Sequence, residues 1–248
     1  MLSRLFSRSV LSRSSALIVC LISPLPVRAE NAMQAPAPAV AHFVTVADFD
    51  FAHLVPAPPE PGSLAARADL EAVLQAQAWR TPDQIAWAKV VERDDAFLHA
   101  EILGPWFAPQ HLPLAAAFFK DLADDLHAVD ATSKKPFLRP RPPAVDPRVQ
   151  PCVAVPASTS YPSGSALQAF VWAELLGEAL PEKREALLAR AHRAGWGRVI
   201  GGVHYPSDLV AGRMLADAFL RAARENPAFR ERWTACREEL IAAAKAAR

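Results

Sequence analysis

Three short segments in the second half of the chain carry the side chains best suited to binding and attacking phosphate. The first covers residues 133–142 and combines cations with prolines. Lys134 supplies a point charge, and Arg141 supplies a planar guanidinium that matches phosphate oxygens. Because the prolines exclude a helix, the loop holds its cations stiffly. Taken alone, the segment is equally typical of a solvated charged turn.

The second segment, residues 160–165, leads into an apolar helix. The N-terminus of a helix exposes unpaired N–H groups and a partial positive charge, which together bind anions. Gly164 lets the backbone approach a ligand closely, and Ser163 can donate its hydroxyl. Ordinary helix capping by serine is the alternative interpretation.

The third segment, residues 197–208, contains Arg198 and then His204 and Asp208, which lie four residues apart near the start of a helix. At that spacing both side chains can face one side. A carboxylate there holds the Nδ1–H of the imidazole and leaves Nε2 free as a nucleophile. A histidine beside a helix start is more often a structural cap, so this segment is weak evidence by itself.

Metal catalysis finds little support in the sequence. The seven histidines form no H-E-x-x-H motif, and no two cysteines are spaced as C-x-x-C. We therefore expect no metal and no other cofactor.

The elements that must position these segments are helices. Apolar residues recur at three- and four-residue steps, and no stretch alternates with period two. One expected helix presents Leu64, Leu70, Val73 and Leu74, and another presents Leu114, Phe118, Leu122, Leu126 and Val129. Thr81, Pro82 and Gln84 form a capping box. Further helices are expected to begin near Ser163, Pro181, Pro206 and Pro227, the last capped by Asn226. The pattern predicts an all-α fold, a helical bundle with a Pro-rich N-terminal arm.

The N-terminal part of the chain divides into two regions before the helical one. Residues 1–29 combine a basic start, an apolar run too short to span a bilayer and a small-residue cleavage site, which predicts a signal peptide. Residues 30–62 are rich in Ala and Pro and predict an arm that lies on the domain or extends from it. Residues 63–248 form the helical domain. We expect a periplasmic or secreted protein with no stable membrane anchor after cleavage.

Charge and cysteine content limit the classes of partner. Residues 1–29 hold four arginines and no acid, so the mature chain has a net charge of −3, compared with +1 for the full sequence. This balance argues against binding nucleic acid. Cys152 and Cys236 remain in the mature chain, either as a disulfide or as two free thiols. A homo-oligomer is compatible with the sequence.

Together the three segments resemble the signature of the type 2 phosphatidic acid phosphatase superfamily, K-x6-R-P, P-S-G-H and S-R-x5-H-x3-D. Their order and internal spacings match. The matching residues are Lys134 with Arg141-Pro142, Pro162-Ser163-Gly164 with Ser165, and Gly197-Arg198 with His204 and Asp208. Residues 58–63 and 226–229 are also similar to stretches of the class A bacterial non-specific acid phosphatases. The resemblance therefore covers nearly all of residues 54–240.

The resemblance implies metal-free hydrolysis of small-molecule phosphate monoesters by an exported α-helical protein. In that interpretation His204 is the nucleophile that forms a phosphohistidine, and Asp208 orients it. The phosphate oxygens would be held by Lys134, Arg141, Arg198, Ser163 and the Gly164 amide. Phosphoryl transfer depends mainly on positioning and charge neutralisation, which such a set provides.

Two positions depart from the signature. Gly197 replaces a serine, and Ser165 replaces the histidine that protonates the leaving oxygen. Because a hydroxyl is far too weak an acid, we expect weakened leaving-group protonation, unless His192 or a lysine supplies the proton. The alternatives are a non-catalytic phosphate or phospho-ligand binding protein that retains the anion cradle, and a vanadate-dependent oxidase of the haloperoxidase type.

Overall fold

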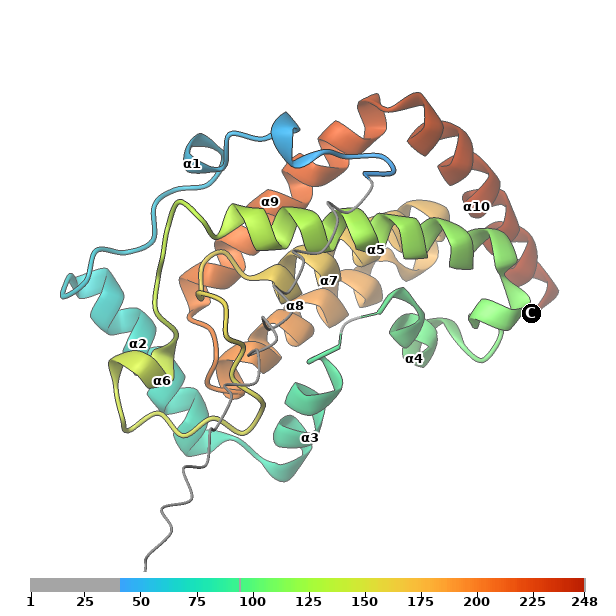
Figure 1. Ribbon diagram of the computed structural model, residues 1–248. Helices are drawn as coiled ribbons and strands as arrows, with labels where there is room; N and C mark the ends of the chain where they lie inside the picture. Colours follow the sequence, from blue (N-terminus) through green and yellow to red (C-terminus); the bar gives the residue numbers. More distant parts are fainter. Residues whose placement is uncertain (1–40, 94, 248) are drawn as a thin grey trace, which may run out of the picture. The chain divides into compact units, whose positions relative to one another are not determined.

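The structure is a computed structural model that describes residues 41–93 and 95–247. The predicted signal peptide and the start of the predicted arm lie outside these residues. Ten α-helices and no strand occur in the described ranges, so the all-α prediction is confirmed (Figure 1). The helices are α1 Phe51–Leu54, α2 Leu64–Trp79, α3 Pro82–Val90, α4 Ala100–Leu103, α5 Pro113–Ser133, α6 Pro142–Val145, α7 Gly164–Ala179, α8 Arg184–Ile200, α9 Pro206–Glu225 and α10 Pro227–Ala246.

Helix α7 forms the centre of the bundle. It contacts α5, α8, α9 and α10, and Figure 1 shows it among these longer helices. Twelve of its sixteen residues are buried. A helix that is apolar on every side belongs in the interior of a bundle. The N-terminus of α7 is therefore held rigidly by its neighbours.

Gly212 brings the start of α7 against α9. A Cβ atom at this position would lie 2.8 Å from Ala166 Cβ and would also overlap with the Ser163 carbonyl oxygen, so only glycine allows this approach. At the contact, the Ser163 N–H donates to the Asp208 carbonyl oxygen at 3.0 Å. The second segment, residues 160–165, and the third, residues 197–208, thus lie side by side.

The expected apolar faces are largely confirmed. In α5, Phe118, Leu122, Leu126 and Val129 are buried, but the prediction was wrong for Leu114, which is 53% exposed at the end of the helix. In α2, Val73 is buried, whereas Leu64 is 78% exposed because the first turn projects beyond the helices that cover the rest.

Several helix starts carry side-chain caps, including the two that the sequence predicts, at Thr81 and at Asn226. Ser63 Oγ accepts from Ala66 N at 3.1 Å, and Asn226 Oδ1 accepts from Ala228 N at 2.8 Å. Thr81 and Gln84 form the reciprocal capping box at the start of α3. Each cap satisfies backbone donors that have no partner within the helix.

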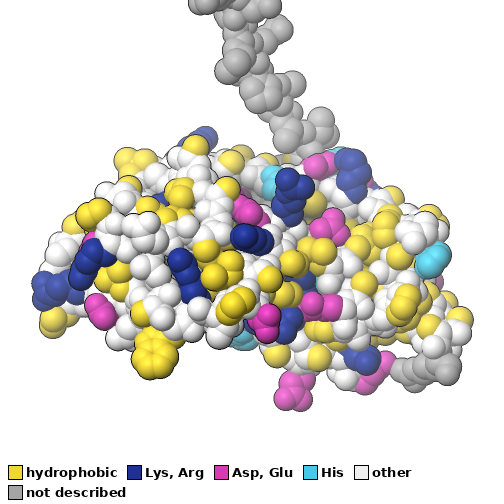
Figure 2. Space-filling view, turned by 90° about the horizontal axis from the view of Figure 1, so that it is seen from below, with side chains coloured by type: hydrophobic (Ala, Val, Ile, Leu, Met, Phe, Trp, Pro, Cys, Tyr) yellow, Lys and Arg dark blue, Asp and Glu magenta, His cyan; other side chains and the backbone are white. Residues whose placement is uncertain are grey.

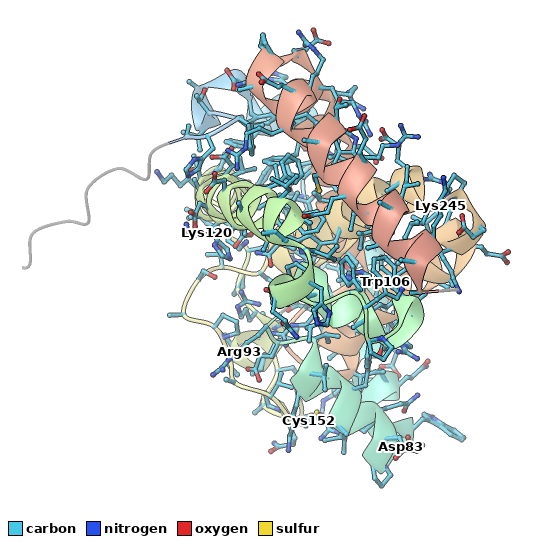
Figure 3. The ribbon with its side chains drawn as sticks, turned by 90° about the vertical axis from the view of Figure 1, so that its right-hand side faces the viewer. Asp83, Arg93, Trp106, Lys120, Cys152 and Lys245 are labelled. Atoms are coloured by element: carbon cyan, nitrogen blue, oxygen red, sulfur yellow. The ribbon has the colours of Figure 1, made fainter. Side chains whose placement is uncertain are left out.

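Both described cysteines are free thiols, which decides between the two alternatives left by the sequence. Cys236 is buried in α10, and burial raises its pKa to about 12. Cys152 lies near the end of the molecule that contains Asp83 of α3, away from α10 (Figure 3). In the described part of the chain, no helix is long and apolar enough to cross a membrane.

The segment before α2 packs onto α5 through Asp125. This buried carboxylate accepts from the backbone N–H groups of His42, Phe43 and Val44 at 2.8, 2.7 and 3.0 Å. The Phe43 ring then packs against Phe118 at a centroid distance of 5.4 Å. A single side chain therefore determines where residues 42–44 join the core.

We predict that Asp125→Ala destabilises the protein by about 3 kcal/mol or more, because it leaves buried N–H donors without acceptors. Urea unfolding followed by circular dichroism measures the loss. Asp124→Ala, a more exposed change on the same helix, serves as the control and should cost less than about 1 kcal/mol. Equal stability losses in the two variants would contradict the role of Asp125.

Candidate active site

His204 lies in the loop between α8 and α9 with its protonation pattern set by two neighbours. Nδ1 is 3.0 Å from Asp208 Oδ2, and Nε2 is 3.1 Å from Arg141 Nη1. A carboxylate only accepts and a guanidinium only donates. The ring is therefore the neutral tautomer with its proton on Nδ1, and the lone pair of Nε2 points toward the cations.

Burial determines the charge of His204. Removal from water is the largest cause that lowers the pKa of the imidazole; Asp208 opposes it, the charges of Arg141 and Lys134 add to it, and the resulting pKa is about 4. The imidazole is consequently neutral at pH values well below the ordinary histidine range. A neutral Nε2 is the form that can attack phosphorus.

Asp208 holds His204 from the first turn of α9. Its buried carboxylate also accepts from the Tyr205 N–H at 2.9 Å, from Arg139 Nη1 at 2.7 Å and from the Ser160 hydroxyl. Burial acts to raise the pKa of Asp208, but the hydrogen bond and charge of His204 and the charge of Arg139 bring it below its ordinary value. Asp208 is thus an ionised, fixed acceptor.

Arg141 is fixed by carbonyl oxygens that leave part of its charge uncompensated. Its guanidinium donates to the carbonyls of Ser158 and Val203 at 2.8 Å and of Thr159 at 3.2 Å. Burial, together with the nearby charge of Arg198, lowers the pKa of Arg141 to about 10. The side chain therefore remains cationic, and Nη1 is aimed at His204.

Arg198 brings a second guanidinium to the site from the last turn of α8. It is buried, and its Nε and Nη1 atoms have no hydrogen-bond partner among the described residues. Burial lowers the pKa of Arg198, with the charge of Glu92 opposing this effect. Buried polar nitrogens without partners are rare, and in a ring of cations they indicate a site for an anion.

Lys134 follows directly after α5 and forms a buried ion pair with Asp130 of that helix. The Asp130 carboxylate in turn packs against Gly164, where a Cβ atom would overlap with it. The first segment therefore meets the N-terminus of α7 through Asp130. Ser163 caps α7 by accepting from Ala166 N at 3.3 Å.

The two departures from the signature have different structural settings. Gly197 faces α3, where a Cβ atom would lie 3.0 Å from Val91 Cγ2, so the missing side chain allows α3 to pack closely. Ser165 is half-buried in the first turn of α7, and no hydrogen bond joins its hydroxyl to another described residue. His192 packs edge-on against Phe170 and lines a separate surface pocket with Trp196.

Four polar residues of the site were not singled out from the sequence. Arg139 donates to Asp69 Oδ2 of α2 and to Ser207 Oγ, each at 2.7 Å, and its guanidinium stacks on the Tyr205 ring at 3.9 Å. Three of these residues carried a sequence signal, since Arg139 lies in the basic loop, Ser160 begins the second segment and Asp130 lies one helical turn before Lys134. Asp69 carried none. The missed residues are Asp69, Asp130, Arg139 and Ser160.

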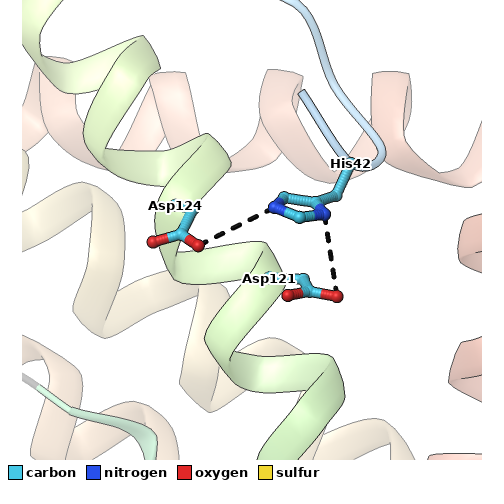
Figure 4. Close-up of side chains that lie close together, drawn as sticks. All are labelled: His42, Asp121 and Asp124. Atoms are coloured by element: carbon cyan, nitrogen blue, oxygen red, sulfur yellow. Dashed lines mark ion pairs between the residues drawn. The ribbon is translucent and has the colours of Figure 1, made fainter. Parts of the chain in front are cut away.

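A histidine and two aspartates that could hold a metal ion lie together outside this site (Figure 4). His42 contacts Asp121 at 3.6 Å and Asp124 at 3.7 Å through its two ring nitrogens. Each carboxylate already has a cationic partner, Arg232 at 2.8 Å and Lys120 at 2.9 Å. The group is best explained as an ion-pair network that fastens His42 to α5.

Charges elsewhere on the surface are mixed. On the face shown in Figure 2, basic, acidic and apolar side chains are interspersed. The concentration of positive charge around His204 is therefore a local feature of a chain whose formal charges nearly balance.

Comparison with known proteins agrees with this arrangement. Residues 117–230 match the family described as the PAP2 superfamily, and this range contains all three segments. The chain carries a PAP2 superfamily domain. The superfamily resemblance is thereby confirmed.

Proteins similar to this chain are named non-specific acid phosphatases. The one from Salmonella typhimurium is 29% identical over 196 residues, covering 74% of this chain and 78% of its own. The one from Providencia stuartii is 34% identical over 80 residues, which is 32% of each chain. A transmembrane PAP2 type phosphatidylglycerolphosphate phosphatase from Bacillus subtilis is 20% identical, with a TM-score of 0.47, covering 66% of this chain and 87% of its own.

We predict that His204 stays neutral down to about pH 4, with its proton on Nδ1. Nitrogen-detected or long-range ¹H–¹⁵N NMR of the imidazole during a pH titration measures this. In Asp208→Asn the pKa of His204 should fall further, because the carboxylate that favours the charged ring is gone. Titration of the wild-type His204 near 6.5, the ordinary value, would contradict the buried, cation-facing setting.

Proposed function

We propose that this protein hydrolyses phosphate monoesters through a phosphohistidine formed on His204 Nε2. The observation that carries the proposal is the neutral His204 itself. Its Nδ1 donates to Asp208 at 3.0 Å, and its Nε2 lies 3.1 Å from Arg141 Nη1. Arg198, which has nitrogens without a partner among the described residues, interacts electrostatically with Arg141. Such cations neutralise the charge of a phosphoryl group at the atom that attacks it. The acid phosphatase relatives support the same reaction.

In the first step His204 Nε2 attacks phosphorus, the Nε2–P bond forms and the P–O bond to the alcohol breaks. Lys134, Arg141 and Arg198 would neutralise the phosphoryl oxygens, with the Ser163 hydroxyl and the Gly164 amide as further donors. Asp208 keeps Nδ1–H in place and stabilises the positive charge that develops on the ring. In the second step water attacks phosphorus, the Nε2–P bond breaks and inorganic phosphate leaves.

Leaving-group protonation is the weak point of this mechanism. Ser165 occupies the position from which the superfamily signature supplies a histidine, and a hydroxyl does not act as an acid at any working pH. A positioned general acid contributes about 10²- to 10⁴-fold to the rate. Esters with poor leaving groups depend most on this contribution.

The substrates proposed are small-molecule phosphate esters, and the predicted signal peptide would direct the protein to the periplasm or outside the cell.

The opposing proposal is a phosphate-binding protein without turnover. Purified mature protein, assayed with p-nitrophenyl phosphate in the presence and absence of a chelator, separates the two. We expect release of nitrophenol that chelation does not abolish. Phosphate binding without release would favour the binding protein, and bromide oxidation with added vanadate would favour the oxidase.

We predict that His204→Ala abolishes turnover and that Asp208→Asn lowers kcat by about 10²- to 10⁴-fold, because the ring loses its orientation and the partner for its charge. Acid-quenched wild type given radiolabelled substrate should carry an acid-labile phosphohistidine that is absent from His204→Ala. His192→Ala, which lies outside the site, serves as the control and should keep full activity. Full activity in His204→Ala would place the nucleophile elsewhere.

A second prediction concerns Arg198. Its buried nitrogens have no partner among the described residues, so they should destabilise the protein, although they would bind the phosphoryl oxygens of the substrate. Arg198→Met should therefore raise the melting temperature yet lower kcat/KM by about 10²- to 10³-fold. Arg237→Met, an exposed change on α10, should alter neither quantity. Differential scanning fluorimetry and initial-rate kinetics measure both. A variant that is less stable and fully active would contradict the assignment.

A further inference from the structure

The proposed reaction needs a proton at the leaving oxygen, and the residue at 165 does not supply it. A replacement must be an acid that reaches the anion site beside the N-terminus of α7. His192 does not meet this condition, because it faces Phe170 and a separate surface pocket. Asp130 of α5 does meet it.

Asp130 lies at the point where the first two segments of the site meet. Its carboxylate is in contact with Gly164, so closely that any Cβ atom at 164 would overlap with it. The Gly164 amide and Ser165 belong to the same turn of α7. The Asp130 carboxyl group therefore lies beside the residue that precedes Ser165, the position that lacks the signature histidine.

The Asp130 carboxylate also interacts electrostatically with cations of the anion site. It forms a buried ion pair with Lys134, and Lys134 in turn acts on the charge of His204. It also acts on Arg141, whose positive charge it favours. Asp130 is therefore within reach of the cations that the proposed mechanism assigns to the phosphoryl oxygens.

Solvent exposure places Asp130 on the outer side of the site. Its side chain is 29% exposed, compared with 4% for His204 and 6% for Lys134. In-line attack by Nε2 directs the leaving oxygen away from His204. For Asp130 to act on it, the substrate alcohol must leave toward solvent past this more exposed carboxylate.

We propose that Asp130 is the general acid that protonates the leaving oxygen in place of the signature histidine. When phosphate enters, Lys134 turns from the carboxylate to a phosphoryl oxygen, and the partly exposed Asp130 takes up a proton from solvent. The Nε2–P bond forms, the P–O bond breaks, and the Asp130 proton passes to the departing alkoxide to give the alcohol. Asp130 then takes a proton from the water that attacks phosphorus, so it is again protonated when the Nε2–P bond breaks. This inference rests on the proposed function.

The charged groups beside Asp130 come from the first segment of the site. Lys134, which follows directly after α5, pairs with the carboxylate, Arg141 interacts with it electrostatically, and Gly164 of α7 contacts it. A bound phosphate dianion would occupy both cations and place a like charge beside Asp130, so that a proton taken up from solvent is held on the carboxyl group.

Asp130→Asn tests this assignment, since the amide keeps the size of the side chain but has no acidic proton. We compare p-nitrophenyl phosphate, whose leaving group needs little protonation, with glycerol 2-phosphate, whose leaving group needs a full proton. The variant should lose about 10²-fold or more in kcat/KM on the alkyl ester and less than about 10-fold on the aryl ester.

Three further variants serve as controls. Asp124→Asn removes a carboxylate that pairs with Lys120 at the same four-residue spacing on α5, and it should leave both substrates unaffected. His192→Asn should do the same, because His192 faces Phe170 and a separate surface pocket. Asp130→Glu keeps the acid and should retain a larger share of alkyl-ester activity than Asp130→Asn, which guards against a defect of folding.

Equal losses on the two esters, or no loss on either, would overturn the role of Asp130. The acid-quenched phosphohistidine of the wild type separates this outcome from failure of the proposed function. If the phosphoenzyme forms and Asp130→Asn shows no leaving-group dependence, only the assignment of Asp130 is wrong. If no phosphoenzyme forms on His204, the proposed function is wrong as well.

Discussion

The buried carboxylate of Asp208 is the constraint on which the rest of the site depends. An ionised carboxylate out of water is costly unless its oxygens are fully paired. Asp208 obtains its partners from separate segments, including His204, Ser160 and Arg139, and Arg139 extends the network to Asp69 of α2. The hydrogen bonds and ion pairs that compensate this buried charge join the basic loop, the segment before α7, the start of α9 and helix α2. The geometry of the imidazole follows from the same requirement.

Arg141 and Arg198 have the opposite character, since they are buried with less compensation than they need. Arg141 is held by carbonyl oxygens and Arg198 keeps two nitrogens without partners in the described chain, whereas Lys134 is neutralised by Asp130. The surrounding helices must supply the stability that such a cluster costs. The tightly packed α7 and the close approach of α9 at Gly212 provide the rigid support.

The two departures from the superfamily signature coincide with local changes in packing or charge. At Gly197 the absent side chain leaves room for Trp87 of α3 and for Val91 directly after that helix, which lie against the glycine. At Ser165 the absent imidazole accompanies a carboxylate, Asp130, that lies on the neighbouring glycine. In both places a residue from a helix distant in sequence occupies the space beside the altered position. A residue missing from a motif is therefore best judged together with what lies next to it in space.

The sequence alone determined the fold class and the chemical character of the site, because both depend on local information. Helix starts are encoded by caps such as Thr81 with Gln84 and Asn226, and the motif spacings identified the side chains of the three segments. Other features depend on which distant helices meet. These are the exposure of Leu64 and Leu114 at helix ends and the ion pairs of Arg139 with Asp208 and with Asp69. The neutral state of His204, the free thiols and the contact of Asp130 with Gly164 were likewise decided by tertiary structure. Burial, distance and the local dielectric act between residues remote in the chain, and no spacing in the sequence specifies them.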